Sequence, residues 1–103
     1  MFESTGGRGF RIRFPNGLIV SVQWGYCLHC ENYNNRTIGD KANSTIASQF
    51  YCSSKDAEVA VIDNSTGELV TEKFMPDAYD IKGYCSPMEV ADLIHRVSIA
   101  TEG

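Results

Sequence analysis

A turn between two alternating runs limits the fold of this chain more than any other feature. The run FRIRF at 10–14 alternates apolar side chains with arginine, and LIVSVQW at 18–24 keeps the same period of two. This period is typical of β-strands with one buried face. Asn16-Gly17 lies between the runs, and Asn-Gly is the strongest short hairpin signal because both residues tolerate positive φ. The sequence therefore predicts an antiparallel hairpin at the start of the chain.

A second hairpin is predicted further along. The run AEVAVID at 57–63 is apolar on both faces, which indicates a central strand. The turn residues Asn64-Ser65-Thr66-Gly67 follow it, and ELVTEKF at 68–74 is the predicted return strand.

One helix is predicted near the C-terminus, from Pro87 to about Ile99. Ser86 is a helix N-cap, Pro87 stands at the first helical position and Glu89 completes a capping box. Apolar residues then recur at helical spacing, and the predicted apolar stripe consists of Val90, Leu93, Ile94 and Val97.

These elements predict a single α+β domain over residues 1–103, an antiparallel sheet of two hairpins with about four to five strands, packed on one C-terminal helix. A flexible start is expected over residues 1–8. Residues 25–56 lose apolar periodicity and gather Asn, Ser, Thr and Gly, which predicts a long functional loop.

Charge excludes some classes of partner. The net charge is −4, which argues against general nucleic-acid binding because phosphate neutralisation usually requires a basic face. Basic residues outnumber acidic ones in residues 1–50 and the reverse holds in residues 51–103, so an anionic ligand is better tolerated by the first half. No apolar stretch reaches the length of a membrane span, and a cytosolic chain is expected.

The cysteines raise the question of a metal. Zinc requires four nitrogen or sulfur ligands that converge tetrahedrally. A single C-x-x-C with an internal histidine and one further cysteine supplies such a candidate set, consisting of Cys27, His29, Cys30 and Cys52. A disulfide is an alternative, and ordinary free thiols are the favoured interpretation. No cofactor is expected unless zinc is bound.

Aromatic, arginine and asparagine residues gather around the end of the first hairpin. Aromatic rings stack on bases, arginine grips phosphate or carboxylate, and asparagine reads polar edges. The candidate ligand-binding residues are Arg11, Arg13, Trp24, Tyr26, Asn32, Tyr33 and Arg36. The alternative is that they are core aromatics and loop polar residues. Neither a nucleophile–base arrangement nor a phosphate loop is recognisable, so a binding protein is favoured over an enzyme.

Three segments carry a resemblance. FPNGLIVSVQWGYC, then AEVAVID, then the GY-x-SP-x-EVA pattern that opens the last helix resemble short uncharacterised proteins of bacteriophages and prophages. The resemblance implies a non-enzymatic counter-defence protein in the host cytoplasm, expected to be a homo-oligomer. Its expected partner is a nucleotide-derived immune signal that it sequesters, or a host defence protein that it blocks. The alternative function is a small zinc-stabilised structural or protein-interaction module.

Overall fold

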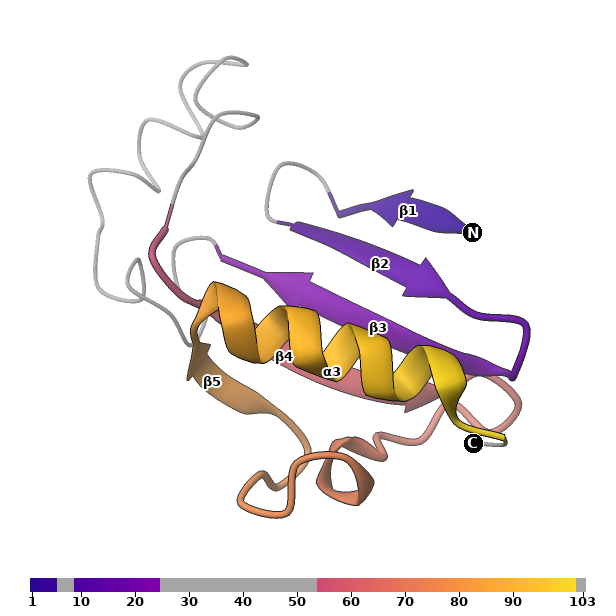
Figure 1. The fold of residues 1–103 in the computed structure, drawn as a ribbon. Coiled ribbons are helices and arrows are strands. Elements are labelled where there is room, and N and C mark those ends of the chain that lie inside the picture. Colours follow the sequence, from indigo (N-terminus) through magenta and orange to yellow (C-terminus); the bar gives the residue numbers. More distant parts are fainter. Residues whose placement is uncertain (6–8, 25–53, 102–103) are drawn as a thin grey trace.

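The fold is a five-stranded antiparallel sheet with one helix across it. A computed structural model describes residues 1–5, 9–24 and 54–101 (Figure 1). The sheet order is β1-β2-β3-β4-β5, and the α+β class predicted from the sequence is confirmed. The elements are β1 (Phe2–Ser4), β2 (Gly9–Arg13), β3 (Leu18–Gln23), β4 (Ala57–Asp63), the 3₁₀ helix η1 (Thr71–Lys73), β5 (Lys82–Cys85) and α3 (Pro87–Ile99).

The first hairpin forms as predicted. Phe10 pairs with Val22 and Arg11 with Ser21, so the turn sets which residues share a face. Gly17 has a φ of 87°, in the left-handed region that the Asn-Gly signal anticipates. The backbone N–H of Gly17 donates to the carbonyl of Phe14 at 3.1 Å and closes the turn.

Asn16 also ties this turn to the end of α3. Its side-chain amide donates to the carbonyl oxygens of Val97 and Ala100, at 2.8 and 2.9 Å. Its side-chain oxygen accepts from the backbone N–H of Leu18 at 3.1 Å. The last carbonyls of a helix lack the usual partner four residues on, and the carbonyl of Val97 also accepts the backbone N–H of Ala100 at 3.3 Å, so Asn16 adds a donor to two carbonyls at the end of α3.

The predicted return strand at 68–74 is wrong. Only Leu69 bridges to β4, opposite Ile62, and η1 follows at once. The reason is Thr71, whose hydroxyl accepts from the backbone N–H of Val61 at 2.9 Å and donates to the carbonyl of Asp80 at 2.6 Å. The side-chain hydroxyl of Thr71 thus takes the place of the backbone carbonyl that a neighbouring strand would offer to Val61. The fifth position in the sheet is filled by β5, which pairs with β4 through a register shift between Ala57 and Val59.

The chain opens with a short edge strand, and the expected flexible start over 1–8 stays a prediction. Phe2–Ser4 forms β1, with Phe2 opposite Ile12 and Glu3 opposite Arg11. The side chain of Glu3 binds Arg13 at 2.8 Å, which adds a contact from the edge strand to its neighbour. A strand of three residues is too short to show a period in the sequence.

The helix α3 begins with the predicted cap. The hydroxyl of Ser86 accepts from the backbone N–H of Glu89, and the carboxylate of Glu89 accepts from the backbone N–H of Ser86. Leu93 and Val97 are fully buried, whereas Val90 and Ile94 are partly buried beside them.

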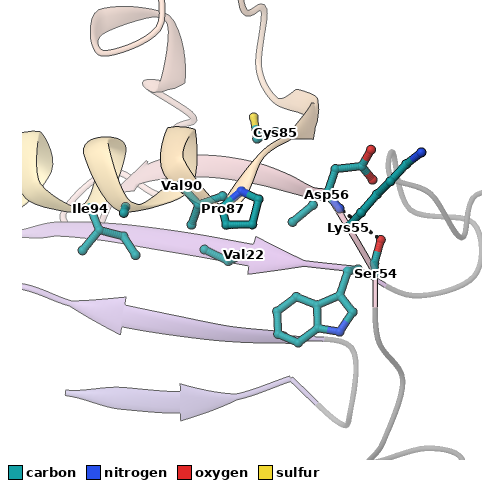
Figure 2. Close-up of a pocket in the computed structure, with 11 residues that line it drawn as sticks. Val22, Ser54, Lys55, Asp56, Cys85, Pro87, Val90 and Ile94 are labelled. Carbon is teal, nitrogen blue, oxygen red and sulfur yellow. Dashed lines mark hydrogen bonds between the residues drawn. The ribbon is translucent and has the colours of Figure 1, made fainter.

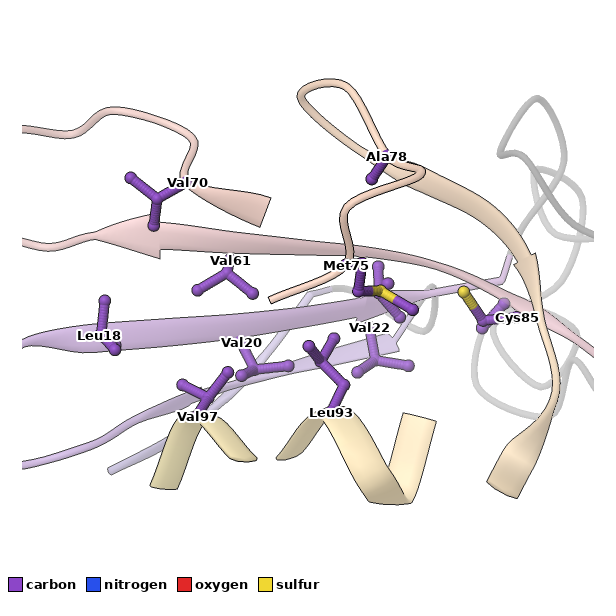
Figure 3. Packing of buried hydrophobic residues seen from close by; sticks show 12 residues of the cluster. Leu18, Val20, Val22, Val61, Val70, Met75, Ala78, Cys85, Leu93 and Val97 are labelled. Carbon is purple, nitrogen blue, oxygen red and sulfur yellow. The ribbon is translucent and has the colours of Figure 1, made fainter. Parts of the chain in front are cut away.

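The core lies between α3 and one side of the sheet, here called the helix face. Figure 3 shows Leu93 and Val97 of α3 pointing toward Val20 and Val22 of β3. Residues of the chain after β4 close the far side of this core, and they are Val70, Met75 and Ala78. The helix contacts β3, β4 and β5. The other side of the sheet, here called the reverse face, carries Arg11, Arg13, Ile19, Ser21 and Ala60.

Candidate functional site

Among the described residues of the predicted ligand set, Trp24 lies beside a pocket. It follows the end of β3 on the helix face, because it alternates with Val20 and Val22. The ring of Phe10 stands edge-on to its indole, with centroids 6.2 Å apart and an interplanar angle of 71°. This contact packs the indole against β2.

The two predicted arginines of β2 lie on the reverse face, so the sheet separates them from Trp24. Arg13 donates from Nε to Glu3 at 2.8 Å and from a terminal nitrogen to the side-chain oxygen of Asn64 at 3.2 Å. The hydrogen bond from Arg13 holds the pKa of the exposed Glu3 carboxyl below its ordinary value. The structure therefore does not gather the described members of the predicted set into one site.

The remaining predicted residues fall outside the described ranges. They are the ligand candidates Tyr26, Asn32, Tyr33 and Arg36 and the zinc candidates Cys27, His29, Cys30 and Cys52, together with most of the predicted loop at 25–56. Their roles stay predictions. Within residues 1–5, 9–24 and 54–101, no three His, Cys, Asp or Glu side chains group as a metal site would require. In the same ranges no helix has the length and apolar character needed to cross a membrane.

A pocket of about 320 Å³ lies between α3 and the ends of β3 and β4. In Figure 2, Pro87, Val90 and Ile94 lie on the helix side and Val22 on the strand side. The complete lining consists of Val22, Trp24, Ser54, Lys55, Asp56, Ala57, Cys85, Pro87, Val90, Ala91 and Ile94.

The pocket is apolar along its length and polar at one rim. Ser54, Lys55 and Asp56 are consecutive and precede β4, so their polar groups gather at one end (Figure 2). The backbone N–H of Asp56 donates to the hydroxyl of Ser54 at 3.4 Å, which shapes this rim as a turn. An apolar lining with a few polar groups at one side suits a ligand with a flat apolar body and a polar edge.

The α3 wall was not predicted from the sequence as part of a site. The rim residues Ser54, Lys55 and Asp56 lie at the end of the predicted functional loop at 25–56, but they were not among the candidate ligand-binding residues. The sequence did carry a signal for the α3 wall. Ala91 is a small residue beside the apolar stripe of the helix, and a larger side chain at this position would fill the pocket. Nothing in the sequence marked Ser54 as a neighbour of Trp24, because thirty positions separate them in the chain.

Cys85 lines the pocket as a buried neutral thiol. Its exposed fraction is 0%, and burial raises the pKa of this thiol from its ordinary value of 9.0 to about 11. Because the thiolate is the reactive form, such a shift makes Cys85 a weak nucleophile at neutral pH. The folded state favours the protonated thiol, so this contribution to stability is complete below pH 9.0 and is lost as the pH rises toward about 11.

We expect Cys85 to react about 100-fold more slowly with iodoacetamide in the folded protein than in urea at pH 8, because two pKa units separate the thiolate populations. A short alkylation pulse, digestion and mass spectrometry of the peptide that contains Cys85 measure both rates. The other cysteines do not interfere, since each peptide is quantified separately. Equal rates in the two states would contradict the assignment of Cys85 as a buried, protonated thiol.

Comparison with known proteins gave no match: no family model, no curated protein and no solved structure resembles this chain significantly. The case for a function therefore depends on the geometry of this pocket and on the residues around it.

Proposed function

We propose that this chain is a non-catalytic binding protein that holds the flat ring of a small ligand between α3 and the ends of β3 and β4. The observation that carries the proposal is the distribution of groups in the pocket, with aliphatic side chains and one indole along its length and polar groups at one rim. Its volume of about 320 Å³ falls at the lower end of the range for small-molecule sites, roughly 300–1,000 Å³. The ligand class that we propose is nucleotide-derived, bound through its base.

Trp24 supports a base as the bound group. Stacking of a base on an aromatic side chain contributes about 1–3 kcal/mol. The edge-on contact with Phe10 supports the indole from β2, and Ala91 and Ile94 line the pocket on the α3 side.

The rim supports recognition of the polar edge of a base. The carboxylate of Asp56 is an acceptor for ring N–H or amino groups, and the hydroxyl of Ser54 is both donor and acceptor. Lys55 adds a positive charge at the same rim, where a phosphate attached to the base through its sugar would extend out of the pocket.

A sequestering role fits these features better than catalysis does. The thiol in the pocket wall, Cys85, is buried and its raised pKa keeps it protonated, which suits packing rather than attack on a substrate. The resemblance to phage proteins supplies the setting that we propose, in which the chain removes a nucleotide-derived immune signal from the host cytoplasm. Homo-oligomer formation is part of the same proposal.

Intrinsic fluorescence tests the proposal directly, because Trp24 is the single tryptophan of the chain. We expect adenosine or guanosine to quench the emission of Trp24 in a saturable way, because a stacked base replaces water at the face of the indole. Ala91→Phe fills the pocket and leaves the reporter in place, so it should weaken binding by about tenfold or more. Ser98→Phe places the same ring on an exposed position of α3 outside the lining, and it should leave binding within about twofold of wild type.

Two results would overturn the proposal. One is the absence of saturable quenching by either nucleoside up to about 5 mM, a concentration above the dissociation constant of even a weak site. The other is equal affinity in the Ala91→Phe and Ser98→Phe variants. Native mass spectrometry of protein purified from producing cells adds an independent readout, in which a bound nucleotide-derived mass released intact on denaturation supports sequestration and gives the oligomeric state.

A further inference from the structure

Two buried polar side-chain atoms lack a hydrogen-bond partner in the part of the chain that the structure describes. They are the hydroxyl oxygen of Thr5 and Nε of Arg11. Buried polar atoms in folded proteins are nearly always hydrogen-bonded, so an unpartnered pair requires an explanation.

The sheet register brings these two side chains together on the reverse face. Arg11 lies opposite Glu3 in β1 and opposite Ser21 in β3. The backbone N–H of Thr5 donates to the carbonyl of Gly9 at 3.2 Å, which continues the β1–β2 ladder one position past Ser4. Thr5 therefore shares a face with Glu3 and is the diagonal cross-strand neighbour of Arg11, at a Cβ separation of about 7–8 Å or slightly less. A group of a few atoms placed between them can contact both.

The nearest carboxylate does not satisfy Arg11, because a second arginine holds it. Glu3 accepts from Nε of Arg13 at 2.8 Å, although it stands directly opposite Arg11 in the register. Arg13 also donates to Asn64 at 3.2 Å, so both ends of its guanidinium are engaged. A further carboxylate on the reverse face, that of Glu58 in β4, stands opposite Gln23, and Nε of Arg11 has no hydrogen-bond partner among these groups.

We infer that Arg11 and Thr5 form a binding site for an oxyanion, a phosphate or carboxylate group, on the reverse face of the sheet. An oxyanion accepts the hydrogen of Arg11 Nε and that of the Thr5 hydroxyl at once, and arginine suits it because its planar donors match two oxygens of one anion. The hydroxyl of Ser21, which accepts from the side-chain amide of Gln23 at 3.2 Å, keeps its own hydrogen for the same anion. The sheet separates this site from Trp24, so the inference is independent of the base pocket.

The Nε–H signal of Arg11 in ¹⁵N-resolved NMR spectra is the direct probe of this site. Wild-type protein is titrated with inorganic phosphate, methyl phosphate or acetate, with chloride added to keep the ionic strength constant, and the signal is assigned by through-bond correlation to the backbone of Arg11. We expect a saturable shift of this signal that exceeds the shift of the other arginines. The comparison of methyl phosphate with acetate identifies which oxyanion class the site prefers, and inorganic phosphate shows whether the free ion suffices.

Variants separate this site from general charge attraction. Arg11→Gln should weaken anion binding by about tenfold or more, and Thr5→Val, which replaces the hydroxyl with a methyl group, should weaken it by about threefold or more. Lys73→Gln removes the same charge from an exposed position of η1 and should leave binding unchanged. Because the wild-type titration and Thr5→Val need no arginine substitution, instability of Arg11→Gln leaves the test intact.

The inference is overturned if none of the three anions shifts the Arg11 signal with saturation, since Nε then has no anion as its partner. It is also overturned if Lys73→Gln and Thr5→Val weaken binding equally, because a diffuse electrostatic effect would explain that result.

Discussion

Replacing Leu93 with alanine is expected to lower the free energy of unfolding by about 2–5 kcal/mol. Leu93 has no exposed surface and packs from α3 onto the β3 and β4 side chains of the helix face (Figure 3). Truncation removes buried apolar contacts and leaves a cavity, because strands on one side and the capped helix on the other limit how far the site can close. Urea unfolding followed by circular dichroism measures the change.

Met88→Ala is the matched control for this prediction. Met88 lies on the same helix with 80% of its surface exposed, and its truncation should change stability by less than about 0.5 kcal/mol. A Leu93→Ala protein that unfolds at the same urea concentration as Met88→Ala would contradict the core described above, in which α3 is seated on β3 and β4.

Gly9→Ala is expected to be the most damaging backbone substitution in β2, at more than about 3 kcal/mol. A Cβ atom at this position would stand 1.9 Å from the carbonyl oxygen of Val22 and 2.8 Å from the Cα of Gln23, and both of these are backbone atoms that a rotamer change cannot move. The φ of 154° adds strain for any residue with a side chain. Thermal and urea unfolding of the variant measure the loss.

Gly17→Ala separates the clash from the effect of φ alone. Gly17 has a φ of 87°, but no atom lies within 4 Å of the position of an added Cβ. The expected cost is therefore the left-handed backbone penalty of about 1–2 kcal/mol. Equal losses in Gly9→Ala and Gly17→Ala would show that β2 and β3 do not approach each other at Gly9 as closely as described.

The parts of the fold that were predicted correctly depend on local signals. The Asn16-Gly17 turn and the Ser86 capping box each act within a few residues, so their physical causes are complete in the sequence. The strand at 57–63 was predicted for a related reason, because a run that is apolar on both faces suits only the interior of a sheet.

The errors arise where a side chain makes a contact over a longer distance. The run at 68–74 has the composition of a strand, but the hydroxyl of Thr71 replaces a ladder carbonyl for Val61 and turns the chain into η1. In β1, a strand of three residues, Glu3 contacts Arg13, which lies ten positions further along the chain. Neither contact can be predicted by adding up the local propensities of the residues.

The candidate site contains one feature that the sequence could predict and one that it could not. The separation of Arg11 from Trp24 follows from the period of two and the register of the first hairpin, so it was available from the sequence. The pocket itself was not, because it requires Trp24, the residues before β4 and one side of α3 to meet. Such a meeting is set by how the helix crosses the sheet, and the sequence gives no crossing angle.

The central claim is that a base occupies the pocket under α3, and intermolecular nuclear Overhauser effects test it most directly. With adenosine bound to ¹³C-labelled protein, the account predicts contacts from the base protons to the indole of Trp24 and to the methyl groups of Ala91 and Ile94. Contacts confined to residues outside this lining, or no contacts under conditions where adenosine binds, would contradict it.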